Sequence, residues 1–209
     1  DRDSWLVTRL LETMQGSQDT LLLISPYFVP GTQGSEGLKK LVAKGARVAV
    51  VTNSLAANDV PAVHSGYARY REALLRGGVQ LHEMRARAPA GIAGVLGSSG
   101  ASLHTKAFVV DDRRGFVGSF NLDPRSAHLN TEMGVLFDDP ALAAAVREEY
   151  ERLAAPGQSY AVFLDEDGRV RWRDGSEQPP RVLDTEPDAS LGRRAFARVL
   201  RWLPIESQL

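Results

Sequence analysis

Hydrophobic and polar positions alternate along the first half of the chain in blocks that predict strands separated by helices. The stretches 21–25, 47–52 and 79–84 are short and largely apolar, as is typical of strands buried on both faces of a sheet. Between them, 35–44 and 61–76 have helical character, and glycine follows each of them. This strand–helix–strand–helix–strand order predicts a mainly parallel sheet covered by helices.

Three further strands are predicted in the middle of the chain. Leu103–Val110, Phe116–Asn121 and Thr131–Phe137 are rich in β-branched and aromatic residues, and a turn of sequence DDRRG joins the first two. A helix should follow from Pro140 to Leu153, with Asp139 as its cap. The side chains expected on its buried face are Leu142, Val146, Tyr150 and Leu153.

The sequence Ala155-Pro156-Gly157 interrupts the pattern, and we place a domain boundary there. Residues 1–155 would form the main domain, and residues 156–209 a C-terminal extension. The extension is predicted to contain a β-hairpin over 159–173, an irregular crossing, and an amphipathic helix over 191–203.

The predicted C-terminal helix combines an apolar stripe with a basic face. The stripe consists of Phe196, Val199, Leu200 and Leu203, and the other face of Arg194, Arg198 and Arg201, with Trp202 at the edge. A basic face beside an apolar face with tryptophan suits the surface of an anionic membrane. The alternative is a helix that docks on the domain and leaves its arginines in water.

Composition narrows the possible partners. The net charge is −1, so no overall positive field attracts nucleic acid, and the absence of cysteine excludes disulfides and thiolate metal sites. No apolar run is long enough to span a bilayer, and no signal peptide is recognisable. Because the chain begins at Asp1 without methionine, we expect it to be a fragment of a longer protein or a processed product.

Candidate chemistry is concentrated between Leu103 and Asn121. Alternation along a strand would place His104 and Lys106 on one face, and Ser119 and Asn121 on one face of the returning strand. Glu132 is the charged residue within the third apolar strand. Buried polar groups must be paired, so these side chains are expected to form one network.

Such a network suits phosphoryl transfer. The His104 imidazole can attack phosphorus and form a covalent intermediate, and a carboxylate, assigned here to Glu132, can orient the ring and support its charge. Lys106, Ser119 and Asn121 can hold the non-bridging oxygens, so no metal or other cofactor is required. Asp111 ends the first strand on the opposite face, and we expect it to hold the turn.

Two side chains outside this stretch are candidates for substrate binding. Tyr27 follows a predicted strand in the loop SPYFVP, where it either lines a substrate pocket or belongs to the core. His64 lies near the start of the helix 61–76, and it is either a solvent-exposed or capping residue or a headgroup contact at the mouth of the site. The loop 86–102, rich in alanine, glycine and serine, could form a flap over the site.

The pattern H-x-K-x4-D formed by His104, Lys106 and Asp111, followed by GSFN at 118–121, resembles the HKD signature of the phospholipase D superfamily. The ending LPIESQL is similar to that of bacterial members of the cardiolipin synthase type. The resemblance implies a phospholipase D-like α/β sandwich with a mixed central sheet covered by helices. It also implies a bacterial enzyme, cytoplasmic or peripheral to the membrane, that transfers a phosphatidyl group through a phosphohistidine.

The sequence departs from the family in one respect, because members use two HKD motifs and no second H-x-K exists in this chain. The partner motif must then come from a missing N-terminal half or from a homodimer mate. The expected partners are a phospholipid substrate, that second half, and a membrane surface. The alternatives are a dimeric single-motif phosphodiesterase of the nuclease type and an inactive fragment, although the neutral charge argues against a nucleic-acid partner.

Overall fold

The structure is a computed structural model that describes residues 5–86, 103–128 and 131–202. Its elements in chain order are α1 (Trp5–Gln15), β1 (Thr20–Ile24), α2 (Gly31–Ala43), β2 (Arg47–Asn53), α3 (Pro61–Arg76), β3 (Gln80–Met84), β4 (Lys106–Val110), β5 (Arg114–Gly118), α4 (Pro124–His128), β6 (Gly134–Asp138), α5 (Pro140–Ala154), β7 (Ser159–Leu164), β8 (Val170–Asp174), β9 (Arg181–Leu183) and α6 (Leu191–Leu200). The suggested flap and the C-terminal sequence LPIESQL fall at 87–102 and 203–209, outside the described residues.

The strands form one nine-stranded sheet in the order β6-β5-β4-β1-β2-β3-β7-β8-β9. The pairs β1–β2 and β2–β3 are parallel, and the remaining neighbours are antiparallel. The predicted mixed α/β fold is therefore confirmed. The expectation of a mainly parallel sheet is wrong beyond the first three strands, because hairpins extend the sheet on both sides of the β1–β3 unit.

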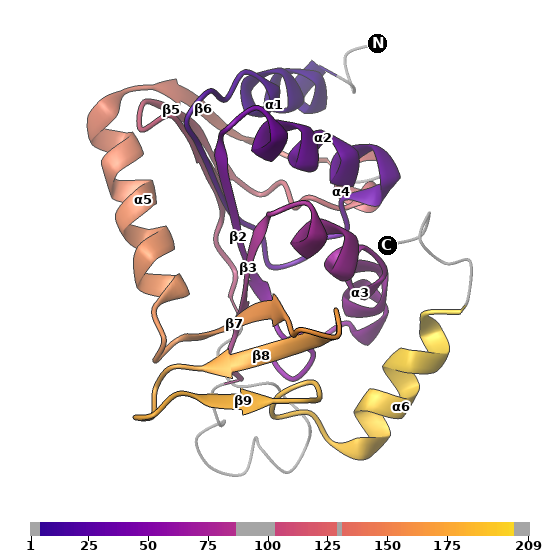
Figure 1. Cartoon of the computed structure of the whole chain (residues 1–209). Coiled ribbons are helices and arrows are strands. Elements are labelled where there is room, and N and C mark those ends of the chain that lie inside the picture. Colours follow the sequence, from indigo (N-terminus) through magenta and orange to yellow (C-terminus); the bar gives the residue numbers. More distant parts are fainter. Residues whose placement is uncertain (1–4, 87–102, 129–130, 203–209) are drawn as a thin grey trace, which may run out of the picture.

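Helices cover both faces of the sheet (Figure 1). Helices α1, α2 and α3 lie on one face, α5 lies on the other, and α6 rests against α3 at the C-terminal end of the chain (Figure 1). None of the helices within the described ranges is both long enough and apolar enough to cross a membrane.

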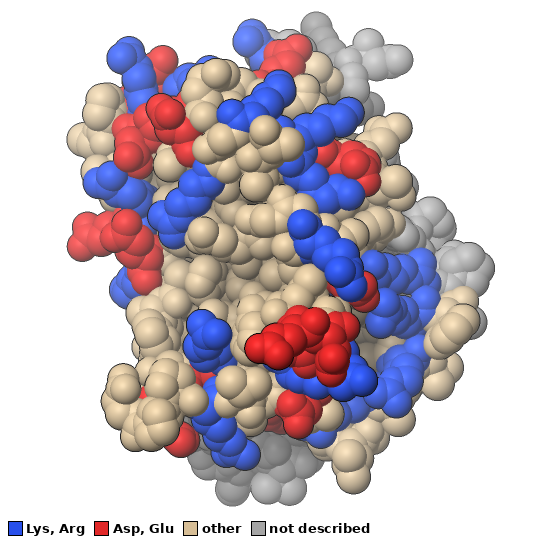
Figure 2. All heavy atoms as spheres, viewed as in Figure 1, with Lys and Arg blue, Asp and Glu red and all other residues tan. Residues whose placement is uncertain are grey.

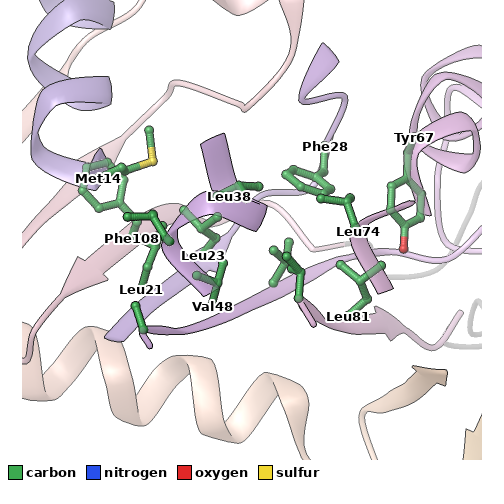
Figure 3. Close-up of a cluster of buried hydrophobic side chains, with 14 of the residues drawn as sticks. Met14, Leu21, Leu23, Phe28, Leu38, Val48, Tyr67, Leu74, Leu81 and Phe108 are labelled. Carbon is green, nitrogen blue, oxygen red and sulfur yellow. The ribbon is translucent and has the colours of Figure 1, made fainter. Parts of the chain in front are cut away.

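The central strand β1 contributes alternate side chains to two separate cores. Leu21 and Leu23 pack with the α1–α3 layer, whereas Leu22 and Ile24 pack against α5. Figure 3 shows the first of these cores, in which Met14, Leu38 and Tyr67 close over the sheet. This two-sided burial is the reason that β1 is an almost continuous apolar run.

Helix α5 begins as its sequence predicts and buries a slightly different face. The Asp139 carboxylate accepts hydrogen bonds from the amides of Ala141 and Leu142, which confirms the cap. Leu142, however, is exposed, and Ala143 takes its place among the buried side chains. Ala143 joins Val146, Tyr150 and Leu153 in the core cluster on this side of the sheet.

The C-terminal extension continues the same sheet. Strand β7 pairs with β3, and β8 and β9 follow, so the residues after the boundary proposed at 155/156 add three strands to the sheet of the main domain. The crossing predicted to be irregular contains the short strand β9. The boundary itself stays a prediction.

Helix α6 docks on the domain through a face that the sequence analysis did not anticipate. Ala197 is buried, and its carbonyl oxygen accepts a hydrogen bond from the Ser65 hydroxyl of α3. Docking of the helix is therefore confirmed, and Arg198 and Arg201 face water as expected, whereas Arg194 is half-buried and donates to the Glu186 carbonyl. Phe196 instead faces solvent, as do the other apolar residues Leu191, Val199 and Trp202.

Candidate active site

The strand register brings the candidate residues to one end of the sheet. Lys106 opens β4 and pairs with Gly118 at the end of β5, which in turn pairs with Gly134 at the start of β6. Ser119 follows β5 and Glu132 precedes β6, so both lie at the edge where Lys106 lies. The carboxyl ends of the parallel strands β1 and β2 meet the same edge, which is where open α/β sheets bind ligands.

His104 lies just before β4 and not on it, contrary to the predicted strand Leu103–Val110. The residue before it is held by Asn53 at the end of β2. The amide of Leu103 donates to Asn53 Oδ1 over 3.1 Å, and Asn53 Nδ2 donates back to the Leu103 carbonyl over 3.5 Å. These bonds replace strand pairing at Leu103, and the His104 side chain is exposed as a result.

Lys106 is half-buried, and its Nζ donates to the His104 carbonyl oxygen over 2.7 Å. Burial lowers the pKa of this ammonium, and the nearby carboxylates of Glu132, Asp123 and Asp59 oppose that shift. Lys106 thus fixes the main chain at His104 through this hydrogen bond, and three carboxylates lie near its ammonium. A cation in this position can neutralise a bound phosphate oxygen.

Glu132 and Ser119 form the second pair of the site. The Ser119 hydroxyl donates to Glu132 Oε2, and the amide of Met133 donates to the same hydroxyl over 3.0 Å. Ser119 is thus a partner of Glu132 in this structure. The expected pairing of Glu132 with the His104 imidazole stays a prediction.

Asn121 is buried at the end of this segment. Its main-chain amide nitrogen lies 3.4 Å from the hydroxyl oxygen of Ser126. Within the described part of the chain, the side-chain oxygen Oδ1 has no hydrogen-bond partner. A buried amide group with an unmet hydrogen-bonding atom is costly unless a ligand or another group completes it. Asn121 is therefore suited to contact a polar substrate.

Tyr27 extends the site on the side of β1. Its hydroxyl donates to Asp59, and burial together with that carboxylate raises the pKa of the phenol. The main chain of this loop is tied to the segment after the GSFN motif, since the amide of Val29 donates to the Leu122 carbonyl over 2.7 Å. Tyr27 thus lies near the cluster, with its hydroxyl engaged by an acid.

Two acids near Lys106 were not among the predicted site residues. Asp59 belongs to the polar loop after β2, and Asp123 is a buried residue whose carboxylate accepts from the Ser126 amide over 2.7 Å. Burial raises the pKa of Asp123, and hydrogen bonds from Ser126 oppose the shift. The signal in the sequence was the pattern Asp-Pro-x-Ser, which indicates a helix start and gives no hint of proximity to Lys106.

His64 is located differently from the sequence expectation. It is 1% exposed, so the solvent-exposed or capping alternative is wrong. Its Nε2 lies 3.3 Å from Glu186 Oε2, among side chains of α3 and of the C-terminal extension. Burial follows from the docking of the extension over α3, which the sequence pattern of α3 did not reveal.

Asp111 connects the β4–β5 hairpin to the loop before β1. Its Oδ1 accepts hydrogen bonds from the amides of Asp19 and Thr20 at 2.9 Å, and both carboxylate oxygens accept from the amide of Gln18. Burial opposes ionisation of the carboxyl, but these hydrogen bonds outweigh it and lower the pKa of Asp111. The side chain therefore anchors the hairpin that carries Lys106.

The anchor gives a pH-dependent prediction. Asp111→Asn should lower the free energy of unfolding at neutral pH by about 1–3 kcal/mol, the usual value of hydrogen bonds to a charged acceptor. Because the folded pKa lies below the ordinary value of 3.8, the contribution is complete above that value and is lost as the pH falls through the folded pKa. Urea unfolding of both proteins at several pH values should therefore show a difference that shrinks in acid; a constant difference would contradict the ionic role.

Comparison with known proteins agrees with this geometry. Residues 10–154 match the family described as "Cardiolipin synthase, PLD-like domain". The chain is 40% identical over 209 residues to cardiolipin synthase C of Escherichia coli K12, an alignment that covers 98% of this chain and 44% of that protein. The chain thus spans less than half the length of this relative.

Two solved structures share the fold. The phospholipase D family member Nuc from Salmonella typhimurium has a TM-score of 0.59 at 15% identity, over 75% of this chain and 90% of Nuc. The phosphatidylserine synthase of Haemophilus influenzae has a TM-score of 0.57 at 22% identity, over 75% of this chain and 36% of that enzyme. By its family match and its likeness to cardiolipin synthase C, the chain belongs to the phospholipase D superfamily and to its cardiolipin synthase-like branch.

Proposed function

We propose that this chain supplies one half of the active site of a phosphatidyltransferase of the cardiolipin synthase type. The observation that carries the proposal is the meeting of His104, Lys106, Ser119 and Glu132 at one edge of the sheet, where the imidazole is exposed and the half-buried Lys106 ammonium donates to the His104 carbonyl oxygen. The family match and the 40% identity to cardiolipin synthase C support a lipid phosphodiester as substrate.

The proposed chemistry has two balanced steps. An imidazole nitrogen of one histidine, either His104 or that of the second motif, bonds to phosphorus while the bond from phosphorus to the alcohol oxygen breaks, and the leaving alkoxide takes a proton from the other histidine. The oxygen of an acceptor alcohol, or of water, then attacks phosphorus, breaks the P–N bond and returns a proton to that histidine. An alcohol acceptor gives transfer, and water gives hydrolysis.

The remaining side chains stabilise the negative charge on the non-bridging phosphate oxygens. Lys106 is placed to balance the non-bridging oxygens, and the Ser119 hydroxyl and Asn121 amide can hydrogen-bond to them. Glu132, engaged by Ser119 in this structure, would turn to the imidazole and support its positive charge. Asp111 acts at a distance by fixing the hairpin.

The second motif must come from outside this sequence. The edge strand β6 offers a surface for that half, because Met133 is 77% exposed and Val135 is exposed beside it, both adjoining the site. The occupant is either the part of a longer chain that precedes these residues or a second copy related by a two-fold axis. In both cases two histidines face one phosphodiester.

Helix α6 supports an attachment to the membrane surface. Its exposed side includes Trp202, which is 86% exposed, together with Phe196 and Val199, and the arginines Arg198 and Arg201 lie beside them. Tryptophan with aliphatic side chains and flanking cations is the combination that binds anionic lipid interfaces. We therefore propose a peripheral contact between α6 and the bilayer that holds the substrate.

A dimeric phosphodiesterase of the nuclease type is the second candidate, and the fold shared with Nuc supports it. Against it, Lys and Arg are interspersed with Asp and Glu over most of the face in Figure 2, without a continuous basic strip for a nucleic-acid backbone. Lys and Arg gather near α6 at the right of that view.

The mass of the chain in solution, measured by light scattering on a sample also assayed with a phospholipid and a DNA substrate, tests these alternatives. A dimer that transfers or cleaves the lipid would show that two copies complete the site. An inactive monomer that becomes active with the N-terminal half of its parent protein would show the two-motif arrangement. Cleavage of DNA in preference to lipid would overturn the proposal in favour of the nuclease.

Lys106→Ala should weaken the binding of inorganic phosphate to the site by at least about tenfold, since a charge-assisted hydrogen bond of 1.5–3 kcal/mol is removed. The readout is isothermal titration with phosphate. A matched control is Lys40→Ala, which removes the same charge from α2 at a distance from the cluster. Equal affinities in all three proteins would contradict the role assigned to Lys106.

A further inference from the structure

A cavity of about 200 Å³ lies between α3 and the C-terminal extension, separate from the HKD residues. Its charged and titratable wall residues are His64 and Arg71 of α3, Asp184 and Glu186 of the crossing segment, and Arg194, Arg198 and Arg201 at α6. Trp172 and Ala197 add apolar surface. The cavity is therefore formed where the extension docks on the main domain.

Positive charge dominates this wall. Arg71 is compensated by Glu83 and Glu186, which lie 2.9 and 2.7 Å from its two terminal nitrogens. Within the part of the chain that the structure describes, the guanidinium groups of Arg198 and Arg201 form no hydrogen bond or ion pair. Figure 2 shows Lys and Arg gathered near α6, with Asp and Glu beside them. A hollow in which four arginines face two acids, Asp184 and Glu186, attracts an oxyanion.

The floor of the cavity has unmet hydrogen-bonding capacity. His64 is almost completely buried, and among the described residues its Nδ1 has no hydrogen-bond partner, nor has Nε of Arg71. Buried polar atoms of this kind are rare, because an unpaired polar atom loses its hydrogen bonds to water on burial. A ligand that accepts hydrogen bonds from the imidazole and guanidinium groups would remove that cost.

We propose that this cavity is a second anion-binding site, distinct from the HKD site, that takes a phosphate ester. A phosphate offers several acceptor oxygens, which matches the donors of His64, Arg198 and Arg201. The bulk of a phosphate headgroup is compatible with the volume of the cavity. A lipid headgroup and a soluble phosphate ester both carry this phosphate group. The experiment below distinguishes these two sources.

Two features connect the cavity to its surroundings. The exposed apolar side of α6, with Val199 and Trp202, begins next to Arg198 and Arg201, so acyl chains of a bound lipid could rest there. The Arg193 guanidinium donates to the carbonyls of Leu55 and Asn58 in the loop that also carries Asp59, the partner of Tyr27. An occupied cavity would thus steady a loop shared with the candidate active site.

The test uses the 209-residue chain with Lys106→Ala, so that the HKD site contributes little phosphate affinity. Arg198→Gln/Arg201→Gln in this background is compared with Arg147→Gln/Arg152→Gln, which removes two arginines from α5 on the opposite face of the sheet (Figure 1). The probes are sn-glycerol 3-phosphate, titrated calorimetrically, and sedimenting vesicles of phosphatidylcholine with or without phosphatidylglycerol. Thermal unfolding verifies that all variants remain folded.

We expect Arg198→Gln/Arg201→Gln to weaken glycerol phosphate binding at least about tenfold and the α5 variant to change it less than twofold. A parallel loss of binding to phosphatidylglycerol vesicles would identify a lipid headgroup, and unchanged vesicle binding would identify a soluble ester. Equal affinities of the two variants for glycerol phosphate would overturn the site. So would a loss confined to vesicles, which would reflect surface charge alone.

Discussion

His104→Ala is expected to lower the rate of lipid phosphodiester turnover at least about a thousandfold when it is introduced into the assembly that contains both motifs. The imidazole is the proposed nucleophile at phosphorus or the acid that protonates the leaving oxygen, so its removal takes away the reacting group itself. Because the side chain is exposed and β4 begins two residues later, the fold should be unaffected. The measurement is the rate of phosphatidyl transfer, with circular dichroism as a check of folding.

The matched control is His82→Gln, which alters a histidine of β3 whose Nδ1 lies 3.2 Å from the Tyr150 hydroxyl. That histidine faces α5 and has no contact with the cluster, so activity should remain within a few-fold of the parent. A labelled phosphatidyl donor should leave an acid-labile phosphatidyl label on the parent enzyme. If His104 is the nucleophile, this label should be absent from His104→Ala. Undiminished turnover in His104→Ala would refute its assignment to the reaction.

Glu83→Leu is expected to have the largest effect on stability, lowering the free energy of unfolding by about 3–5 kcal/mol. Glu83 is 0% exposed in β3. Its carboxylate accepts hydrogen bonds from the Tyr67 hydroxyl at 3.1 Å, Arg71 Nη1 at 2.9 Å and Trp172 Nε1 at 2.8 Å. Removing this acid leaves the buried Arg71 guanidinium paired, among the described acids, with Glu186 alone. The three donors that Glu83 accepted from also lose that acceptor.

Urea unfolding measures the change, and two further variants make it diagnostic. Glu72→Leu removes an exposed acid that pairs with Arg76 on the same helix, and it should cost no more than about 1 kcal/mol. The double variant Glu83→Leu/Arg71→Met should recover part of the loss, because it removes the uncompensated charge as well. A double variant less stable than the sum of the single changes would contradict this account.

The same network bears on the proposed boundary at 155/156. Trp172 and Glu186 belong to the extension, whereas Glu83 and Arg71 belong to the main domain, and their hydrogen bonds cross between the two. Truncation at the boundary would leave the acid and the guanidinium buried with fewer partners. The extension is thereby a contributor to the stability of the domain that holds the HKD residues.

Much of the local structure could be predicted from the sequence. The limits of α3, the Asp139 cap of α5 and the hairpin of β7 and β8 follow from proline, glycine and periodicity, which act over a few residues. The motif at 104–121 likewise indicated a phosphoryl-transfer site, since its residue types and spacing are specific. These features depend on neighbours in the chain and are therefore encoded locally.

Tertiary structure alone decided which distant groups meet. Asn53 holds Leu103 and thereby takes His104 off the strand, a contact between residues far apart in sequence that no periodicity reveals. The burial of His64 beside Glu186 and the arginine-lined cavity arise because the extension folds back over α3. Local pattern specifies the type of each element, whereas the packing of elements fixes burial, charge pairing and the final geometry of the site, because those depend on surfaces brought together across the whole chain.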